Sequence, residues 1–290
     1  MKGKIVKGIA GFYYVKTVDG IYVAKARGQF KNSGITPMVG DDVEMQITHV
    51  QDREGIIDRV YPRKNSFIRP PISNVDMLAV VVSAYEPKII NYDVLDKFLV
   101  MAESKETDIV ICMNKLDVAD EKDIQEFIDI YKDIYPIYKI SGKTGEGIED
   151  LKEILKGRTV AFAGASGVGK STILKKLKPE AEIETGELSD KTGRGRHTTR
   201  HVEIFDIEEG MVYDTPGFTS FDVSVTDEEN LAFMFPEMSN YISQCKFDNC
   251  RHLKEPGCMV TKAVEEGKIS KRRYDSYISQ MDSIREKKNY

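Results

Sequence analysis

Residues 159–171 read TVAFAGASGVGKS, and this stretch decides the fold of the central region. Its first five residues are apolar and suit a strand that is buried on both faces of a sheet. The next eight match the pattern G-x-x-x-x-G-K-[ST], and Thr172–Leu177 continues as the start of a helix. A strand, a glycine-rich loop and a helix in this order are typical of a phosphate-binding loop. We therefore expect an α/β domain that binds a nucleoside phosphate.

The chemistry of this loop follows from its residue types. Glycines let backbone amides point at phosphate oxygens, and the N-terminus of the next helix adds partial positive charge. Lys170 supplies a point charge for the β- and γ-phosphates, and Ser171 supplies a hydroxyl ligand for Mg²⁺. A glycine-rich turn without function would not need the flanking strand and helix. We predict nucleotide contacts from Gly164, Ala165, Ser166, Gly167, Val168, Gly169, Lys170, Ser171 and Thr172.

A second motif, NKLD at residues 114–117, follows the apolar run Ile109–Met113. Ligands bind beyond the carboxyl ends of parallel strands, which is where this motif falls. Asp117 suits the N1–H and 2-amino group of guanine, whereas adenine would leave the carboxylate unpaired at a cost of about 1–3 kcal/mol. We expect Asn114 to tie this loop to the phosphate loop and Lys115 to lie along the base. An ordinary polar loop between a strand and a helix is the alternative.

Two further loops complete the expected nucleotide site. Ser141, Gly142 and Lys143 follow the next strand, where a backbone N–H would contact guanine O6. DTPG, at residues 214–217, contains Asp214, which would bind Mg²⁺ through water, and Gly217, whose N–H would sense the γ-phosphate. The guanine motif precedes the phosphate loop, which reverses the usual order. Because a site needs its residues together in space and in no particular order, we predict a GTPase with circularly permuted motifs.

The segment between these motifs is basic and glycine-rich: residues 191–201 read KTGRGRHTTRH. One threonine should complete the Mg²⁺ shell, and Thr199 is our choice with Thr198 as the alternative. Many GTPases place a water-orienting Gln just after the last motif, but this chain has Phe218 there. We hypothesise that His197 orients the water; a histidine that only contacts RNA or solvent is the alternative. Phe218 also predicts slow turnover until a partner orders the site.

Residues 1–70 have the pattern of short strands separated by turns. Phe12–Val18 and Ile21–Lys25 flank Asp19-Gly20, a two-residue hairpin signal. Val43–Val50 and Ile56–Val60 flank a second polar turn. About five strands in this length fit a small β-barrel, and residues 69–71, Arg-Pro-Pro, are a plausible linker.

The next part of the chain alternates between strand and helix patterns. Met77–Val82 is a continuous apolar run, as in a buried strand. Such alternation predicts a parallel sheet covered by helices on both sides. The other elements are helices around Leu95–Ala102, Ile124–Tyr131 and Ile148–Leu155, and strands at Ile109–Met113 and Ile137–Ile140.

Three of the four cysteines lie in one short C-terminal stretch with a histidine. Cys245, Cys250, His252 and Cys258 form a closed ligand set for one structural Zn²⁺, with no open position for metal catalysis. Four unrelated residues are the alternative. Further on, Lys268, Lys271, Arg272 and Arg273 lead into a helix with Tyr274, Tyr277, Met281 and Ile284. Its basic and aromatic residues suit RNA contact, and packing of its apolar side on the GTPase domain is the alternative.

Charge is distributed unevenly along the 290 residues. Residues 1–70 carry twelve Lys or Arg against seven Asp or Glu, and residues 268–290 carry seven against three, whereas residues 71–267 carry 23 against 37. Basic ends suggest contact with a polyanion, although solvated surface charge is equally open. No apolar run is long enough to span a bilayer, so we expect a soluble, cytoplasmic protein with no membrane partner. We also expect a monomer.

The rotated motif order, the barrel pattern, GASGVGKS, GRGRHTT, DTPGF and the Cys/His cluster together resemble the ribosome small subunit-dependent GTPase A family (RsgA, the YjeQ/YloQ family) over essentially the whole chain. The resemblance implies a multidomain fold with an N-terminal OB-fold β-barrel at 1–70, a central α/β P-loop GTPase domain with permuted motifs at 71–222, and a mostly helical zinc-binding C-terminal domain at 223–290.

The resemblance also implies the activity. Members hydrolyse GTP to GDP and phosphate with Mg²⁺, are stimulated by the small ribosomal subunit, bind its rRNA and act in its late maturation. The family's nucleotide contacts fall on 114–117 and 164–172 of this chain, its zinc ligands on the Cys/His cluster, and its water-activating histidine on His197. Two rival functions remain: an ATPase or small-molecule kinase, which NKLD disfavours, and an RNA-binding switch that holds GTP without hydrolysing it, which Phe218 keeps open.

Overall fold

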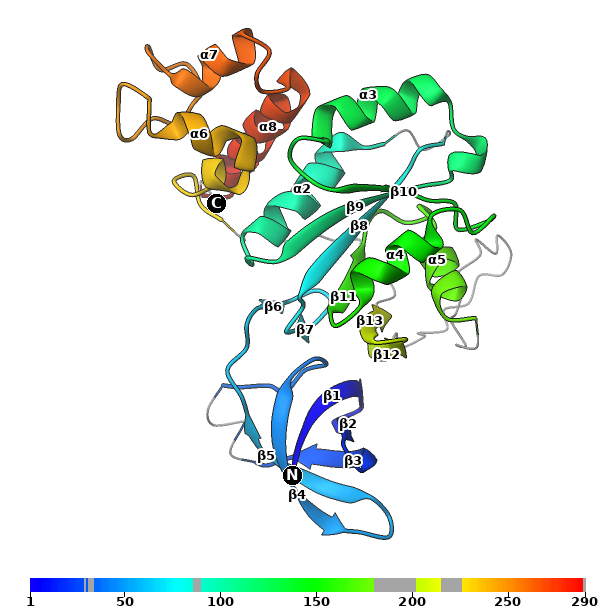
Figure 1. The fold of residues 1–290 in the computed structure, drawn as a ribbon. Coiled ribbons are helices and arrows are strands. Elements are labelled where there is room, and N and C mark those ends of the chain that lie inside the picture. Colours follow the sequence, from blue (N-terminus) through cyan, green and yellow to red (C-terminus); the bar gives the residue numbers. More distant parts are fainter. Residues whose placement is uncertain (29, 31–33, 86–89, 180–201, 215–225, 289–290) are drawn as a thin grey trace, which may run out of the picture. The chain divides into compact units, whose positions relative to one another are not determined.

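The computed structural model describes residues 1–28, 30, 34–85, 90–179, 202–214 and 226–288 (Figure 1). The chain forms two compact units, each made of separate stretches. The first comprises 1–77, 149–162 and 171–218, and the second comprises 78–148, 163–170 and 219–290. Thr198, Thr199, His197, Gly217 and Phe218 lie outside the described residues.

The first unit begins with a closed five-stranded barrel. Its strand order is β1-β2-β3-β5-β4, and a β1–β4 pairing closes it; only β3 and β5 run parallel. Alternate residues such as Ile5, Val15 and Ile57 are completely buried in its core. The Asp19-Gly20 hairpin and the closed barrel confirm the prediction from the sequence. The strands are β1 (Lys2–Ile9), β2 (Phe12–Thr17), β3 (Gly20–Ala26), β4 (Asp42–His49) and β5 (Glu54–Val60).

A short hairpin follows the barrel. It consists of β6 (Ser66–Phe67) and β7 (Ile72–Ser73), and the expected linker residues 69–71 lie in its turn. Ile72 and Ser73 are fully buried. The stretch after the barrel is therefore a packed element that is fixed to its surroundings.

The first unit also contains strands that adjoin the nucleotide motifs. β11 (Thr159–Ala163), which leads to the phosphate loop, pairs parallel with β13 (Gly210–Asp214). Between β13 and barrel strand β1 lies β12 (Glu203–Ile207), antiparallel to both. β12 was not predicted from the sequence, and it connects the barrel to the strand that ends at Asp214. Helices α4 (Ile148–Leu155) and α5 (Lys170–Leu177) flank β11 in the sequence.

The second unit contains the strands β10-β9-β8, in that order. All seven residues of β8 (Met77–Ser83) are buried, as its continuous apolar run predicts. β9 (Asp108–Asn114) pairs parallel with β10 (Ile137–Lys139) and ends at the NKLD motif, whose residues continue into the short helix η1 (Leu116–Val118). The helices are α2 (Tyr92–Glu103), capped by Asn91, and α3 (Glu121–Tyr131), capped by Asp120.

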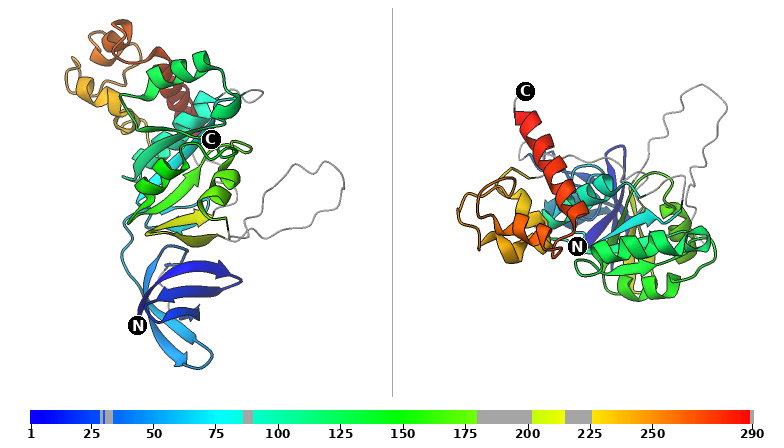
Figure 2. Two further views of the ribbon diagram at one scale, coloured as in Figure 1. Left: turned by 45° about the vertical axis from the view of Figure 1, so that its right-hand side comes forward. Right: turned by 90° about the horizontal axis from the view of Figure 1, so that it is seen from above.

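The C-terminal region is mostly helical, as expected. Its core includes Phe235, Tyr277 and Met281, and it also takes in Val100 of α2. Helix α8 lies against α2 (Figure 2). This confirms the alternative in which the apolar side of the C-terminal helix is packed against another part of the protein. The elements are η3 (Leu231–Met234), η4 (Pro236–Met238), α6 (Ser239–Ile242), α7 (Met259–Glu265) and α8 (Lys271–Lys288). Among the described helices, none is both long and apolar enough to cross a membrane.

Candidate functional site

Asn114, the last residue of β9, links three loops of the second unit. Its side chain is buried; Nδ2 donates to the Val168 carbonyl at 2.8 Å, and Oδ1 accepts from the Gly142 N–H at 2.9 Å. One amide therefore fixes the phosphate loop and the 141–143 loop to the start of NKLD. Gly169 permits this approach, since a Cβ there would lie 2.1 Å from Asn114 Nδ2.

Asp117 is held by the same neighbouring loop. Its Oδ1 accepts from Ser141 Oγ at 2.8 Å, and Lys143 Nζ lies 3.8 Å from Oδ2. Ser141 is fully buried, so its hydroxyl has a fixed position from which to orient the carboxylate. Lys115, between the two, has a left-handed backbone with φ of 69°. The arrangement presents a carboxylate with a set direction, which is what selective recognition of two adjacent N–H donors requires.

Lys170, the first residue of α5, folds back across the phosphate loop. Its ammonium donates to the carbonyls of Gly164 and Ala165 at 2.8 and 2.9 Å. Burial lowers the pKa of Lys170 to about 8 because the charged form loses hydration. Phosphate oxygens are stronger acceptors for an ammonium than carbonyls are. The loop thus has a partly desolvated cation whose charge a phosphate would stabilise.

The residues with expected Mg²⁺ roles that the structure describes belong to the first unit. Ser171 is half-buried in the first turn of α5, and Thr172, beside it, is exposed. Asp214 is half-buried at the end of β13, where it pairs in register with Glu203 of β12. Its position is therefore set by the β12–β13 hairpin.

The four C-terminal metal-ligand residues come together in space. Their ligand atoms all lie within 4.8 Å of one another. His252 Nδ1 lies 3.5 Å from both Cys245 Sγ and Cys258 Sγ. A tetrahedral zinc with bonds of about 2.3 Å to sulfur and 2.0–2.1 Å to nitrogen requires about 3.6 Å between those atoms. The cluster thus fits one structural Zn²⁺.

The chemistry of the cluster also fits a metal. Burial lowers the pKa of His252, which favours the neutral imidazole that a metal binds. Burial raises the pKa of Cys250 to about 12, so its thiolate needs a bound cation. Backbone N–H groups of Met259 and Thr261 donate to the sulfurs of Cys245 and Cys258. These donors would stabilise thiolate charge in a bound site.

Helix α8 holds the metal loop, a role that the sequence did not reveal. The Tyr274 hydroxyl donates to the His252 carbonyl at 2.8 Å, and the Tyr277 hydroxyl donates to the Arg251 carbonyl at 2.6 Å. His252 has a left-handed backbone with φ of 57°, which is costly for a residue other than glycine. The two tyrosines, spaced three apart on one helical face, hold that conformation.

For Arg273, the prediction that the C-terminal basic residues contact RNA is wrong. It is completely buried: Nη1 lies 2.5 Å from Asp96 of α2, and Nε lies 2.7 Å from Glu237 of η4. Its guanidinium also lies 4.7 Å from the centre of the Phe235 ring. Arg273 is therefore unavailable for RNA contact and instead joins the C-terminal region to α2. Nothing in the local sequence distinguishes it from its exposed neighbours.

Comparisons with known families and proteins agree with this architecture. The RsgA N-terminal domain family matches residues 2–57, and the RsgA GTPase family matches residues 60–224. The small ribosomal subunit biogenesis GTPase RsgA of Alkaliphilus metalliredigens is 43% identical over 291 residues, covering 100% of this chain and 99% of that protein. Its namesake from Caldanaerobacter subterraneus is 44% identical over 289 residues, covering 99% and 97%.

Two solved structures share the fold. The crystal structure of YloQ, a circularly permuted GTPase, matches with a TM-score of 0.82 at 36% identity, covering 99% of this chain and 95% of that one. The crystal structure of YjeQ from Thermotoga maritima matches with a TM-score of 0.84 at 36% identity, covering 98% of each chain.

Proposed function

Because the chain belongs to the RsgA family of GTPases, we propose that it hydrolyses GTP to GDP and phosphate on the small ribosomal subunit. It binds that subunit and its rRNA, acts in late small-subunit maturation, and turns over faster when the subunit is bound. The relatives carry small ribosomal subunit biogenesis in their names. We further propose that the protein works in the cytoplasm as a monomer.

The observation that best supports guanine-nucleotide binding is the double hydrogen bond of Asn114. Its amide joins Val168 of the phosphate loop and Gly142 of the next loop, although these residues are far apart in a permuted sequence. This link would hold a base and a triphosphate at a fixed separation. Asp117 then supplies the acceptors for guanine, while Lys115, Ser141 and Lys143 line the base, as proposed assignments.

The proposed phosphate contacts come from residues 164–172, with Lys170 on the β- and γ-phosphates. Charge builds up on the transferred phosphoryl oxygens and on the leaving group during hydrolysis. A cation already held in the loop would need little rearrangement to stabilise that charge. Mg²⁺, held by Ser171 and Thr199 and through water by Asp214, would neutralise it further, and the Gly217 N–H would contact the γ-phosphate.

His197 is the proposed water-orienting residue, because Phe218 has no polar group to do so. His197→Ala should reduce subunit-stimulated hydrolysis by about 100-fold or more, the usual contribution of general acid–base groups, and leave GTP binding intact. His201→Ala, a like change four residues on, is the matched control. Undiminished stimulated hydrolysis in His197→Ala would rule out this role.

The outer regions are proposed to make the ribosome contacts. The proposed domains are a basic barrel at residues 1–70, the GTPase domain at 71–222 and a zinc-binding domain at 223–290. Twelve Lys or Arg against seven Asp or Glu in the barrel region support RNA contact there. One Zn²⁺ in the Cys/His cluster is proposed to hold the C-terminal domain in its folded form.

Sedimentation with isolated ribosomal subunits tests the proposal. The purified protein is spun through a sucrose cushion with small or large subunits, in the presence of a non-hydrolysable GTP analogue, GDP or a non-hydrolysable ATP analogue. We expect it to pellet with small subunits in the GTP-analogue state and much less with GDP. Equal recovery with both subunits, or equal recovery with all nucleotides, would contradict the proposed function.

A further inference from the structure

The barrel and the strand that ends at Asp214 form one continuous structure within the first unit. β13 pairs with β12, and β12 pairs with barrel strand β1 at Lys7↔Glu203. Two ion pairs reinforce the junction: Lys7 with Glu203 and Lys16 with Asp206, each at 2.6 Å. Both pairs are partly exposed, so they contribute little by themselves. The junction therefore depends on strand pairing and on what is buried beneath it.

The buried part of the junction is Tyr213, the residue just before Asp214. It is completely buried, and its hydroxyl donates to the backbone carbonyl of Ser73 at the end of β7. Gly40, which immediately precedes the barrel residue Asp41, faces the same hydroxyl. A Cβ at Gly40 would lie 2.0 Å from the Tyr213 oxygen and 2.1 Å from the Ser73 oxygen. Any side chain at position 40 would therefore separate Tyr213 from Ser73.

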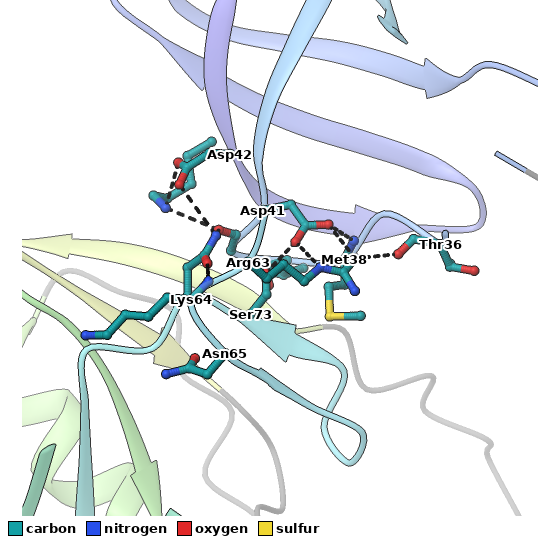
Figure 3. Close-up of polar contacts among 12 residues, drawn as sticks. Thr36, Met38, Asp41, Asp42, Arg63, Lys64, Asn65 and Ser73 are labelled. Atoms are coloured by element: carbon teal, nitrogen blue, oxygen red, sulfur yellow. Dashed lines mark hydrogen bonds and ion pairs between the residues drawn. The ribbon is translucent and has the colours of Figure 1, made fainter. Parts of the chain in front are cut away.

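Ser73 is itself fixed to the barrel through Asp41 (Figure 3). Asp41 is fully buried; its Oδ1 accepts from Ser73 Oγ at 2.6 Å and from Arg63 Nε at 2.7 Å, and its Oδ2 accepts from the Met38 N–H at 2.9 Å. The Ser73 N–H donates to the Val39 carbonyl at 3.0 Å. Ser73, which accepts the Tyr213 hydrogen bond, is thus itself held by Asp41 and Val39.

From this geometry we propose that Tyr213 is a positioning residue through which the barrel sets the placement of Asp214. The proposal rests on the proposed function and adds its regulation. A shift of β13 along its axis would move Asp214 and Tyr213 together. Such a shift must either break the Tyr213–Ser73 bond or move the Gly40–Asp41 segment of the barrel. The barrel's contact with the small subunit and the nucleotide state of the GTPase site are therefore coupled.

Coupling of this kind is reciprocal for equilibrium binding. If a GTP analogue strengthens binding of the protein to small subunits relative to GDP, then small subunits strengthen GTP-analogue binding relative to GDP by the same factor. That coupling factor is a property that a purely structural tyrosine would not alter. A tyrosine that only stabilises the domain would change the melting temperature and leave the factor unchanged.

Tyr213→Phe removes only the hydroxyl and keeps the ring that fills the junction. Loss of one hydrogen bond typically changes an equilibrium by about fivefold, so we expect the coupling factor to fall by about that much. Tyr135→Phe is the matched control, because Tyr135 is also buried and its hydroxyl donates to Glu103 at 3.0 Å. Its coupling factor should equal that of the wild type. Ser73→Ala, which detaches Ser73 from Asp41, serves as a second variant if Tyr213→Phe fails to fold, and it should change the factor in the same direction.

The measurements are titrations of the labelled protein with small subunits in GTP-analogue–Mg²⁺ and in GDP–Mg²⁺, and nucleotide titrations with and without subunits. A reduced coupling factor in Tyr213→Phe, of equal size in both directions, supports the inference. A wild-type factor in folded Tyr213→Phe and Ser73→Ala would overturn it while the proposed function stands. A wild-type protein whose subunit affinity does not depend on nucleotide would instead overturn both.

Discussion

Asn114 shows how a single side chain can make a permuted site work. An amide has both a donor and an acceptor, so the single side chain of Asn114 can donate to the Val168 carbonyl and accept from the Gly142 N–H at the same time. An aspartate would lose the donor, and a leucine would lose both. The loops that read the base and the phosphates are thus joined independently of their order in the chain.

Asp117 should determine the preference of the site for guanine nucleotides. Asp117→Asn replaces an acceptor by an amide whose N–H groups face the N1–H and 2-amino group of guanine. Affinity for GTP should fall by about 10- to 100-fold, as expected for unpaired buried groups, and xanthosine triphosphate, which has an acceptor at C2, should bind better than GTP. Displacement of a fluorescent nucleotide measures both. Asp120→Asn, the same change at the cap of α3, should leave both affinities unchanged because Asn also caps helices.

Lys170 should make nucleotide binding depend on pH. Its pKa is lowered to about 8 by burial, so the folded protein without nucleotide loses this charge as the pH rises through that value. Phosphate favours the ammonium form, so GTP binding should take up a proton and weaken steadily above pH 8. Lys170→Arg, whose guanidinium stays charged, should bind more weakly but with a flatter pH profile. Identical slopes in both proteins would assign the pH dependence to the titration of guanine itself.

Helix α8 connects the metal loop to helix α2. Two successive residues of α8 make different contacts: Arg273 forms ion pairs with Asp96 and Glu237, while the Tyr274 hydroxyl donates a hydrogen bond to the His252 carbonyl. One helix therefore ties the zinc cluster to α2. Zinc binding should stabilise this contact as well as the loop itself.

Arg273→Met tests the buried ion pair. It would leave Asp96 and Glu237 without their cation in a closed environment, and breaking such pairs costs about 3–5 kcal/mol. The free energy of unfolding in urea should fall by that amount. Arg272→Met, at the partly exposed neighbour that pairs with Asp93 at 3.4 Å, should cost about 1 kcal/mol or less. Equal losses for the two variants would show that the buried pair has no special role.

Tyr274→Phe tests the support of the metal loop. Without the Tyr274 hydroxyl, the carbonyl of the left-handed His252 loses its hydrogen-bond donor. Groups that hold a metal ligand in place typically contribute about 10-fold or more in metal affinity. Competition with a chromogenic chelator measures that loss. Ser283→Ala, which removes an exposed hydroxyl bonded within α8, should bind zinc like the wild type, and so should Tyr274→Phe if the tyrosine is only a packing residue.

The sequence allowed strong prediction of elements whose patterns are local. The strand at residues 159–163 and the Asp19-Gly20 hairpin appear where expected, because apolar runs and turn residues act over a few positions. β12 was missed because its five residues show no apolar alternation: the buried Ile204 and Ile207 are three positions apart, whereas a half-buried strand repeats every two. The Glu-Glu-Gly turn at 208–210 was the available signal for a hairpin.

Contacts between distant residues could not be predicted. The burial of Arg273 depends on Asp96, which lies 177 residues away, and no local pattern encodes that pairing. The Tyr213–Ser73 bond spans 140 residues for the same reason. By contrast, the zinc ligands lie within fourteen residues of one another, so a short stretch of sequence was enough to gather them.

Across the whole chain, the barrel and Asp214 are joined by a continuous run of paired strands within the first unit. The permuted order places β12 and β13 between the phosphate loop and the C-terminal region, and β12 pairs with the barrel. The strand that precedes DTPG is thereby linked through β12 to the N-terminal barrel.

The decisive measurement is the rate of GTP hydrolysis with and without isolated small subunits. Large subunits and ATP serve as controls, under the same Mg²⁺ concentration and ionic strength. We expect slow hydrolysis by the protein alone, and strong stimulation by small subunits only, with GTP only. Equal rates with and without small subunits, or equal stimulation by large subunits, would contradict this expectation.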